Sequence, residues 1–320
     1  MTKETGVERI GFRDAVARQP ESLEAVRLTV AEALDTLDVS GFQGNSIGFA
    51  GIGASYQAAL AGAAFLRAMG RRAHAYCSTD LYETADSGAD AFVALSASGQ
   101  SREIADAMRL RSKLPRIAIC RGTDNPLAEI AGAAIGYNSG ADNGASSTGY
   151  TGMLLAIGLL GDCILGQGPR ADWARLPASI ESLLASAAGA AKQASDLLAN
   201  RAAIDLIGSG AGLATAGEAA ILLREAVRAP AAGWDTLNYL HGPMESQDEK
   251  TGLIAFGNER EVQIARDVAA FGCPSVLISI PLRYMHTTVE MLHKNDVEQT
   301  IRLMYETLLA LSPRTNLKYL

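Results

Sequence analysis

The chain has 320 residues, 48% of them hydrophobic and 20% charged, which excludes a disordered protein and suits two domains or one large α/β unit. Its net charge of −7, without a long basic run, argues against nucleic acid or an anionic membrane as the main partner. The four cysteines are far apart and form no CxxC pair, which predicts buried thiols in a reducing compartment rather than disulfides or a zinc site.

Nothing in the sequence predicts export or membrane insertion. The first residues contain no hydrophobic signal-peptide core. The most apolar long stretch, residues 148–165, carries Asp162 and several glycines, so it predicts a buried helix rather than a membrane span. We therefore expect a soluble, cytoplasmic protein that has no membrane partner.

Helix and strand patterns alternate along the chain. An amphipathic pattern predicts a helical segment over residues 11–37. Short apolar runs, separated by predicted helices, then predict strands over residues 46–50, 73–77, 91–95, 116–120 and 134–137. An alanine-rich helix over 185–200 precedes three further strands, predicted over 203–207, 253–256 and 275–280. This alternation is typical of a doubly wound α/β fold with parallel sheets.

The two halves of the chain resemble each other. Residues 47–67 and 204–224 align without gaps, and each segment begins with a strand followed by a GxG turn, which predicts two copies of one α/β unit. The copies differ where chemistry is expected. Ser55 in the first half corresponds to Gly212 in the second, and strand 253–256 is not followed by a serine-rich loop.

Two small-residue loops in the first half predict an anion site without lysine or arginine. The first loop is residues 51–55 (Gly-Ile-Gly-Ala-Ser) and the second is residues 96–101 (Ser-Ala-Ser-Gly-Gln-Ser). Each lies between a predicted buried strand and a predicted helix, where backbone N–H groups and hydroxyls meet the positive end of the helix. We expect a phosphate group to bind the hydroxyls of Ser55, Ser96, Ser98 and Ser101. The rest of the pocket is expected to include Gly53, Ala54, Ala97 and Gly99.

A third segment, residues 144–148 (Gly-Ala-Ser-Ser-Thr), opens the apolar helix and either closes the pocket through Ala145, Ser147 and Thr148 or serves as an ordinary N-cap. A dinucleotide site is not expected, because Tyr56 stands where the third glycine of GxGxxG belongs and no acidic residue ends the next strand.

The second half offers Glu225 and His241. Glu225 lies on a predicted helix over residues 214–227 among apolar residues, where it is either a general base with a raised pKa or a solvated helix acid. His241 precedes Gly-Pro and is either a catalytic or a structural turn histidine. The histidines at 74, 286 and 293 show no ligand spacing, so we expect no metal, and we expect no cofactor.

These residues resemble the SIS (sugar isomerase) domain family in its double-domain form. Within it they resemble the isomerase half of glutamine–fructose-6-phosphate aminotransferases and the related aminosugar-phosphate deaminases and deglycases. The resemblance rests on the SxSGx[ST] pattern at 96–101, on the spacing from Glu225 to His241-Gly-Pro, and on the tail at 313–318. It implies two three-layer α/β/α sandwiches with parallel sheets. The expected domains are an N-terminal helical segment (1–44), a phosphate-binding SIS domain (45–180), a helical bridge (181–200), a second SIS domain (201–312) and a tail that closes the site (313–320).

The resemblance also implies roles for individual residues. It gives the four serines to the sugar phosphate, Glu225 to proton transfer between C1 and C2, and His241 to ring opening. In the family this histidine comes from the partner subunit, which implies a homodimer with a shared site. The catalytic tail lysine of the family corresponds most nearly to Lys318, with the spacing off by one residue.

The sequence departs from the family in three places. Leu222 stands where the family has a lysine, Ala97 replaces a loop glutamine, and there is no glutaminase domain. We therefore expect an aminosugar-phosphate deaminase or isomerase, for example one that converts glucosamine 6-phosphate to fructose 6-phosphate and ammonia. The alternatives are a deglycase of phosphorylated Amadori compounds, an aldose–ketose isomerase, and a non-catalytic sugar-phosphate sensor.

Overall fold

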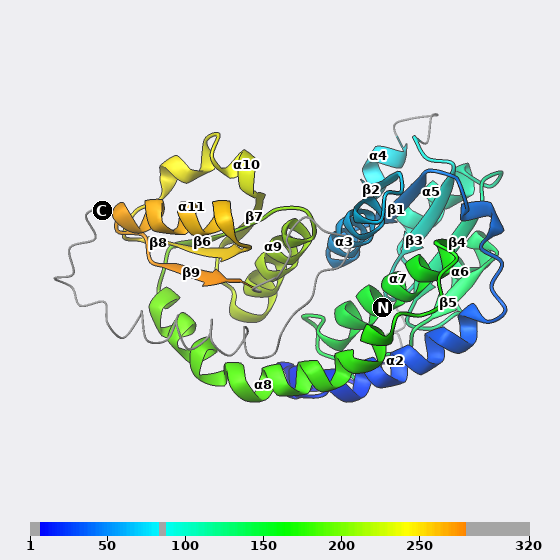
Figure 1. Ribbon diagram of the computed structural model, residues 1–320, viewed down its shortest axis with the longest axis horizontal. Coiled ribbons are helices and arrows are strands. Elements are labelled where there is room, and N and C mark those ends of the chain that lie inside the picture. Colours follow the sequence, from blue (N-terminus) through cyan, green and yellow to red (C-terminus); the bar gives the residue numbers. More distant parts are fainter. Residues whose placement is uncertain (1–6, 83–87, 280–320) are drawn as a thin grey trace.

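The computed structural model describes residues 7–82 and 88–279, and these residues form two parallel β-sheets flanked by helices (Figure 1). The first sheet has the strand order β2-β1-β3-β4-β5 and the second has the order β7-β6-β8-β9. All strand pairs are parallel. The α/β fold class with parallel sheets is therefore confirmed.

The first sheet and its helices occupy the N-terminal half. Their bounds are α1 Phe12–Ala17, α2 Gln19–Leu34, β1 Ile47–Gly51, α3 Ala54–Ala68, β2 Ala73–Cys77, α4 Ser78–Tyr82, β3 Ala91–Leu95, α5 Arg102–Leu110, β4 Arg116–Cys120, α6 Pro126–Ala131, β5 Ala134–Gly136 and α7 Thr148–Ile164. A 3₁₀ turn, Ser40–Phe42, leads into β1.

Helices cover both faces of this sheet because its central strands are apolar on both sides. Every residue of β1 and β3 is buried. On one face, α2, α3 and α7 pack over Phe49 and Val93; on the other, α4, α5 and α6 pack over Phe92. Gly62 permits the close approach of α3 to β1, since a Cβ there would lie 2.9 Å from the Phe49 ring.

A long helix, α8 (Ala171–Leu198), connects the two halves and runs along one side of the molecule (Figure 1). It begins well before the predicted bridge at 181–200 and includes Pro177 in its interior. Trp173, Leu176 and Ile180 pack against the core of the first half, and this packing offsets the helix-breaking tendency of the proline.

The second half is built in the same way. Its bounds are β6 Ala203–Gly208, α9 Ala211–Leu222, β7 Ala231–Asp235, α10 Thr236–Tyr239, β8 Thr251–Phe256, α11 Glu259–Ala270 and β9 Ser275–Ile278. A π-helical turn, Leu223–Val227, extends α9, and a 3₁₀ turn, Pro243–Ser246, follows α10. Tyr239 and Val268 pack on one face of the sheet, and Ala216 and Ala220 of α9 pack on the other.

Helices α3 and α9 lie between the two sheets and pack against each other (Figure 1). A Cβ added to Gly217 of α9 would collide with the amide of Gln57 on α3, so the helices approach closely at this point. Within the described ranges, no helix combines the length and apolarity needed to cross a membrane.

Candidate functional site

The strand order of the first sheet reverses between β1 and β3, and both small-residue loops lie at this reversal. Parallel α/β sheets bind ligands outside the carboxyl ends of the strands at such a point. β1 pairs directly with β3, so the loop over residues 51–55 and the loop over residues 96–101 are neighbours. Gly53, the residue before α3, has φ +58°, and Gly99 in the second loop has φ +65°, a conformation that favours glycine.

Hydrogen bonds within the second loop fix its shape. Ser96 is buried, and its Oγ accepts a hydrogen bond from the Gly99 N–H at 3.1 Å and lies 3.3 Å from Ser101 Oγ. Ser98 Oγ accepts from the Gln100 N–H at 3.2 Å. Asn125 packs beneath the loop, where a Cβ on Gly99 would strike its side chain. The loop is thus held in one conformation before any ligand binds.

The helices that follow these loops begin without a side-chain cap. Neither Gly53 before α3 nor Ser101 before α5 caps its helix with a side-chain hydrogen bond. At α3 the N–H groups of Ser55 and Tyr56 donate to the carbonyls of Ile52 and Gly53, at 3.1 and 2.9 Å, whereas the first N–H groups of α5 lack an intrahelical partner. Ser55, Ser98 and Ser101 are half-buried there. Two helix ends together with three accessible serines suit an anionic group.

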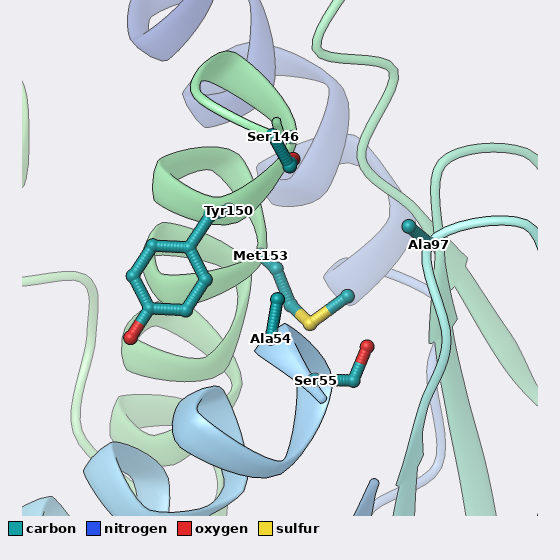
Figure 2. A pocket seen from close by; sticks show the side chains of 7 residues that line it. Ala54, Ser55, Ala97, Ser146, Tyr150 and Met153 are labelled. Atoms are coloured by element: carbon teal, nitrogen blue, oxygen red, sulfur yellow. The ribbon is translucent and has the colours of Figure 1, made fainter. Parts of the chain in front are cut away.

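A small pocket of about 50 Å³ opens beside the loops (Figure 2). Three predicted residues line it, namely Ala54, Ser55 and Ala97. The remaining lining comes from α7 and the residues before it, namely Ser146, Gly149, Tyr150 and Met153. The third predicted segment thus borders the pocket, but through residues other than those named from the sequence.

The predicted residues of this third segment face the protein interior. Ser147 Oγ accepts a hydrogen bond from Gln19 Nε2 at 2.8 Å, and Thr148 Oγ1 donates to the Ala141 carbonyl at 3.0 Å. Ala145 is also buried. Neither hydroxyl lines the pocket. Their hydrogen bonds attach the start of α7 to α2 and to the loop after β5.

Asp142 organises the loop before α7. It is fully buried and accepts hydrogen bonds from the backbone N–H groups of Asn143, Ser147 and Gly149, at 2.8, 2.9 and 3.0 Å. Its Oδ2 also accepts from Ser146 Oγ at 3.0 Å. Burial alone would raise the pKa of Asp142, but these backbone hydrogen bonds and a nearby cation hold it below its usual value.

That cation is Arg121, which the sequence analysis did not select. It follows β4 directly, its backbone N–H donates to the Ala97 carbonyl at 3.0 Å, and its guanidinium forms an ion pair with Asp142. A Cβ on Gly149 would collide with the guanidinium, so the glycine makes room for it. An arginine therefore lies behind the pocket wall, although an anion site without basic residues was predicted. Its position immediately after a predicted strand could have identified Arg121 as a site residue from the sequence.

Glu225 lies in the π-helical turn at the end of α9 and is exposed. The prediction that it sits among apolar side chains is therefore wrong. A π-helical turn inserts one residue per turn and redirects the side chains that follow, and such turns are frequent at functional sites. Its role in catalysis stays a prediction.

Glu218 is the buried acid of this helix, and sequence reasoning assigned it no role. Its side chain is 4% exposed, and both carboxyl oxygens lack a hydrogen-bond partner among the described residues. Burial and the charge of Glu225 raise the pKa of Glu218 to about 8. The charge of Glu218 in turn adds to burial in raising the pKa of Tyr150, which lines the pocket. Seven residues would put Glu218 and Glu225 on one face of an unbroken α-helix, but the π-helical turn separates them, so this spacing did not signal the burial of Glu218.

The remaining predicted site residues lie away from this pocket or outside the described residues. His241 is exposed in the turn after α10 and does not line the pocket. The adjacent Gly242, at φ +137°, shapes that turn. Lys318 and the tail at 313–320 fall outside the described residues.

The corresponding reversal in the second sheet is occupied by a carboxylate. Glu261 of α11 is 7% exposed, and its Oε1 accepts hydrogen bonds from Ser209 Oγ at 2.9 Å and Thr236 Oγ1 at 2.6 Å. A Cβ on Gly257 would touch the same carboxylate. A negative charge at this position repels a phosphate. The described residues also contain no group of three or more histidine, cysteine or acidic side chains that could hold a metal ion.

Comparison with protein families finds one match, to the M42 glutamyl aminopeptidase model over residues 264–303. That is about an eighth of the chain, and residues 280–303 lie outside the described part, so the match shows no family membership. No curated protein matches the sequence.

Several solved structures share the fold. The C-terminal domain of glucosamine-fructose-6-phosphate aminotransferase from Francisella tularensis is 20% identical, with a TM-score of 0.72 over 84% of this chain and 83% of that one. Tagatose-6-phosphate ketose/aldose isomerase from Escherichia coli is 18% identical, with a TM-score of 0.67 over 96% of both chains. Glucosamine-6-phosphate deaminase from Thermotoga maritima is 15% identical, with a TM-score of 0.61 over 82% of this chain and 85% of that one. The chain therefore has the parallel α/β fold of these sugar-phosphate proteins.

Proposed function

We propose that the protein is an enzyme that processes a phosphorylated sugar at the strand reversal that carries the 51–55 and 96–101 loops. The observation that carries the proposal is the convergence of two uncapped helix N-termini and three accessible serines at one strand reversal. The matching reversal of the second sheet holds Glu261 instead. The fold is shared with proteins named for their action on sugar phosphates.

In this proposal the phosphate binds to Ser55, Ser98 and Ser101 and to the first N–H groups of α5, while Ser96 holds the second loop in shape. Glu225 moves a proton between C1 and C2 of the open-chain sugar, and His241 of a partner subunit opens the ring. Lys318 is brought to the site by the tail. The two halves act as two SIS-type sandwiches, residues 45–180 and 201–312, in a cytoplasmic homodimer.

The reaction we favour is deamination of an aminosugar phosphate to a ketose phosphate and ammonia. Deglycation of a phosphorylated Amadori compound and plain aldose–ketose isomerisation use the same ring opening and proton transfer, so they remain alternatives within the class. The apolar Leu222, in place of the family lysine, lies on the same helix as Glu225 and removes one cation from the aminotransferase pattern.

A substrate panel tests the proposal. The full chain is incubated with glucosamine 6-phosphate, fructose 6-phosphate, tagatose 6-phosphate and phosphorylated Amadori compounds, and both ammonia and ketose phosphate are measured. Ammonia release from the aminosugar phosphate is the expected result. Isomerisation without ammonia would move the assignment to the isomerase class, and tight binding without turnover would indicate a sensor. If the chain neither binds nor turns over any of these sugar phosphates, the proposal is refuted.

A further inference from the structure

The pocket beside the two small-residue loops is lined mainly by carbon atoms. Ala54, Ala97 and Gly149 have no polar side-chain atom. Met153 extends its thioether toward Ala54 and Ala97, and it is almost fully buried, so it forms a fixed wall (Figure 2). The Tyr150 hydroxyl points away from these side chains (Figure 2). Because a cavity with such a lining stays dry when it is empty, an apolar group can enter it without displacing bound water.

The polar groups of the lining are already engaged. Ser146 Oγ donates to Asp142 Oδ2 at 3.0 Å, and the Gly149 N–H donates to the same oxygen at 3.0 Å. The Ala97 carbonyl accepts a backbone N–H at 3.0 Å. The Ser55 hydroxyl is assigned to the phosphate in the proposed function. None of these groups is left to donate a proton to a substrate hydroxyl in the pocket, and burying a hydroxyl oxygen without a partner is costly.

The pocket adjoins the groups that are proposed to bind the phosphate. Ser55 belongs to both, and Ala97 lies between Ser96 and Ser98 in the second loop. Because neighbouring residues are only about 3.8 Å apart, the atoms of a substrate that follow its phosphate reach the pocket. The pocket has a volume of about 50 Å³. A dry cavity of about 150 Å³ holds a benzene molecule, so this pocket has room for about two carbon atoms.

We propose that the pocket receives a carbon group of the substrate that bears no hydroxyl, about two carbon atoms in size and next to the phosphate. The chain thereby selects sugar phosphates that carry a deoxy carbon or a short alkyl group at this position over fully hydroxylated ones. The inference rests on the proposed sugar-phosphate site and adds a substrate class to it. Ala97 determines the selection, because a larger side chain at this residue fills the pocket.

Two series of simple phosphate monoesters test the inference on the full chain. The first runs from methyl phosphate to hexyl phosphate, and the second replaces the terminal methyl group of each longer ester by a hydroxyl. No member contains a carbonyl group or a sugar ring, so ring opening and proton transfer cannot consume it. A ³¹P NMR titration measures dissociation constants into the millimolar range, and inorganic phosphate gives the reference for the phosphate site alone.

For the wild type, the affinity is expected to rise about fourfold for each CH₂ group that enters the pocket, the value for burying one methylene. Because the pocket holds about two carbon atoms, the rise should end after about two additions, and longer chains should gain nothing further. At the lengths that show the gain, the alkyl ester should bind roughly tenfold more tightly, or better, than its hydroxyl counterpart. The hydroxyl counterpart loses the gain and buries an oxygen without a partner.

Two variants assign the effect to this pocket. Ala97→Val adds two methyl groups that fill the space, so the alkyl series should show no gain relative to methyl phosphate in the same variant. Met153→Ala removes most of one wall, so the rise should continue for about two further carbon atoms. Ala211→Val is the matched control, because Ala211 is the exposed residue that aligns with Ala54 in the second half, and it should keep the wild-type profile.

The inference is overturned if the alkyl series of the wild type shows no gain, or if the gain continues evenly to hexyl phosphate, as on an open apolar surface. Equal affinities for the alkyl esters and their hydroxyl counterparts would overturn it as well, and these results need no variant. A gain that persists in Ala97→Val contradicts the assignment to this pocket. In each of these cases inorganic phosphate still binds, so the proposed function stands. If the wild type binds neither inorganic phosphate nor any ester, the proposed function fails together with the inference.

Discussion

Asp142 is expected to determine whether the pocket exists, because it holds the loop before α7 together. Its two oxygens accept three backbone N–H groups and one hydroxyl and pair with Arg121. In Asp142→Asn an NH₂ group replaces one oxygen and faces those donors, while Arg121 loses its counter-charge. Orphaning two buried donors costs about 2 kcal/mol, and breaking a buried pair by removing one partner costs about 3–5 kcal/mol in total. We therefore expect a loss of roughly 3–5 kcal/mol in the free energy of unfolding.

The assay is urea denaturation followed by tryptophan fluorescence. The chain has two tryptophans, Trp173 and Trp234, so a Trp234→Phe background leaves Trp173 to report on the first half alone. The exposed pair Lys192–Asp196 supplies the control, since Asp196→Asn removes an ion pair that is worth well under about 1 kcal/mol.

The same residue predicts a pH dependence. Because the pKa of Asp142 is lowered in the folded protein, its contribution is present above the unfolded pKa and is lost as the pH falls through the folded one. The wild type should therefore lose stability below about pH 4, and Asp142→Asn should lose less over that range. The role of Asp142 would be refuted if Asp142→Asn lowered the free energy of unfolding by less than about 1 kcal/mol and lost stability below pH 4 as the wild type does.

The remaining predictions concern binding and catalysis. Ser98→Ala should weaken sugar-phosphate binding by about 1–3 kcal/mol in a titration, and an unchanged affinity would remove Ser98 from the phosphate site. Glu225→Gln should lower turnover about 100-fold or more with nearly unchanged substrate affinity, and exchange of deuterium at C2 with solvent should stop. Normal turnover would show that the base is another residue, with Lys318 the next candidate. Mixed dimers of Glu225→Gln and His241→Ala subunits should regain part of the activity, whereas no recovery despite demonstrated subunit exchange would contradict a shared site.

Most of the fold could be predicted because parallel strands buried on both faces read as apolar runs. The strands β1, β3 and β4 match the predicted positions closely. The edge strand β7, Ala-Ala-Gly-Trp-Asp, was missed because its residues have little intrinsic preference for strands. It forms by pairing with β6. Adding the offset between the two similar halves to the residue numbers of β2 would have predicted this strand near residues 230–234.

The site could be predicted only where residues that are neighbours in the sequence determine its geometry. Loops 51–55 and 96–101 follow their strands directly, so their meeting at one reversal follows from the strand order. The network of Arg121 with Asp142 and the burial of Glu218 depend on contacts between distant segments. The local pattern around Glu225 suggested burial, but the π-helical turn places it in solvent and leaves Glu218 as the buried acid.

A crystal structure of the full chain with 2-amino-2-deoxyglucitol 6-phosphate tests most directly the claim that the first sheet holds the sugar-phosphate site. The account predicts the phosphate within hydrogen-bonding distance of Ser55, Ser98 and Ser101, at the N-termini of α3 and α5. A phosphate bound at the loop after β6, beside Glu261, or away from both strand reversals would contradict it.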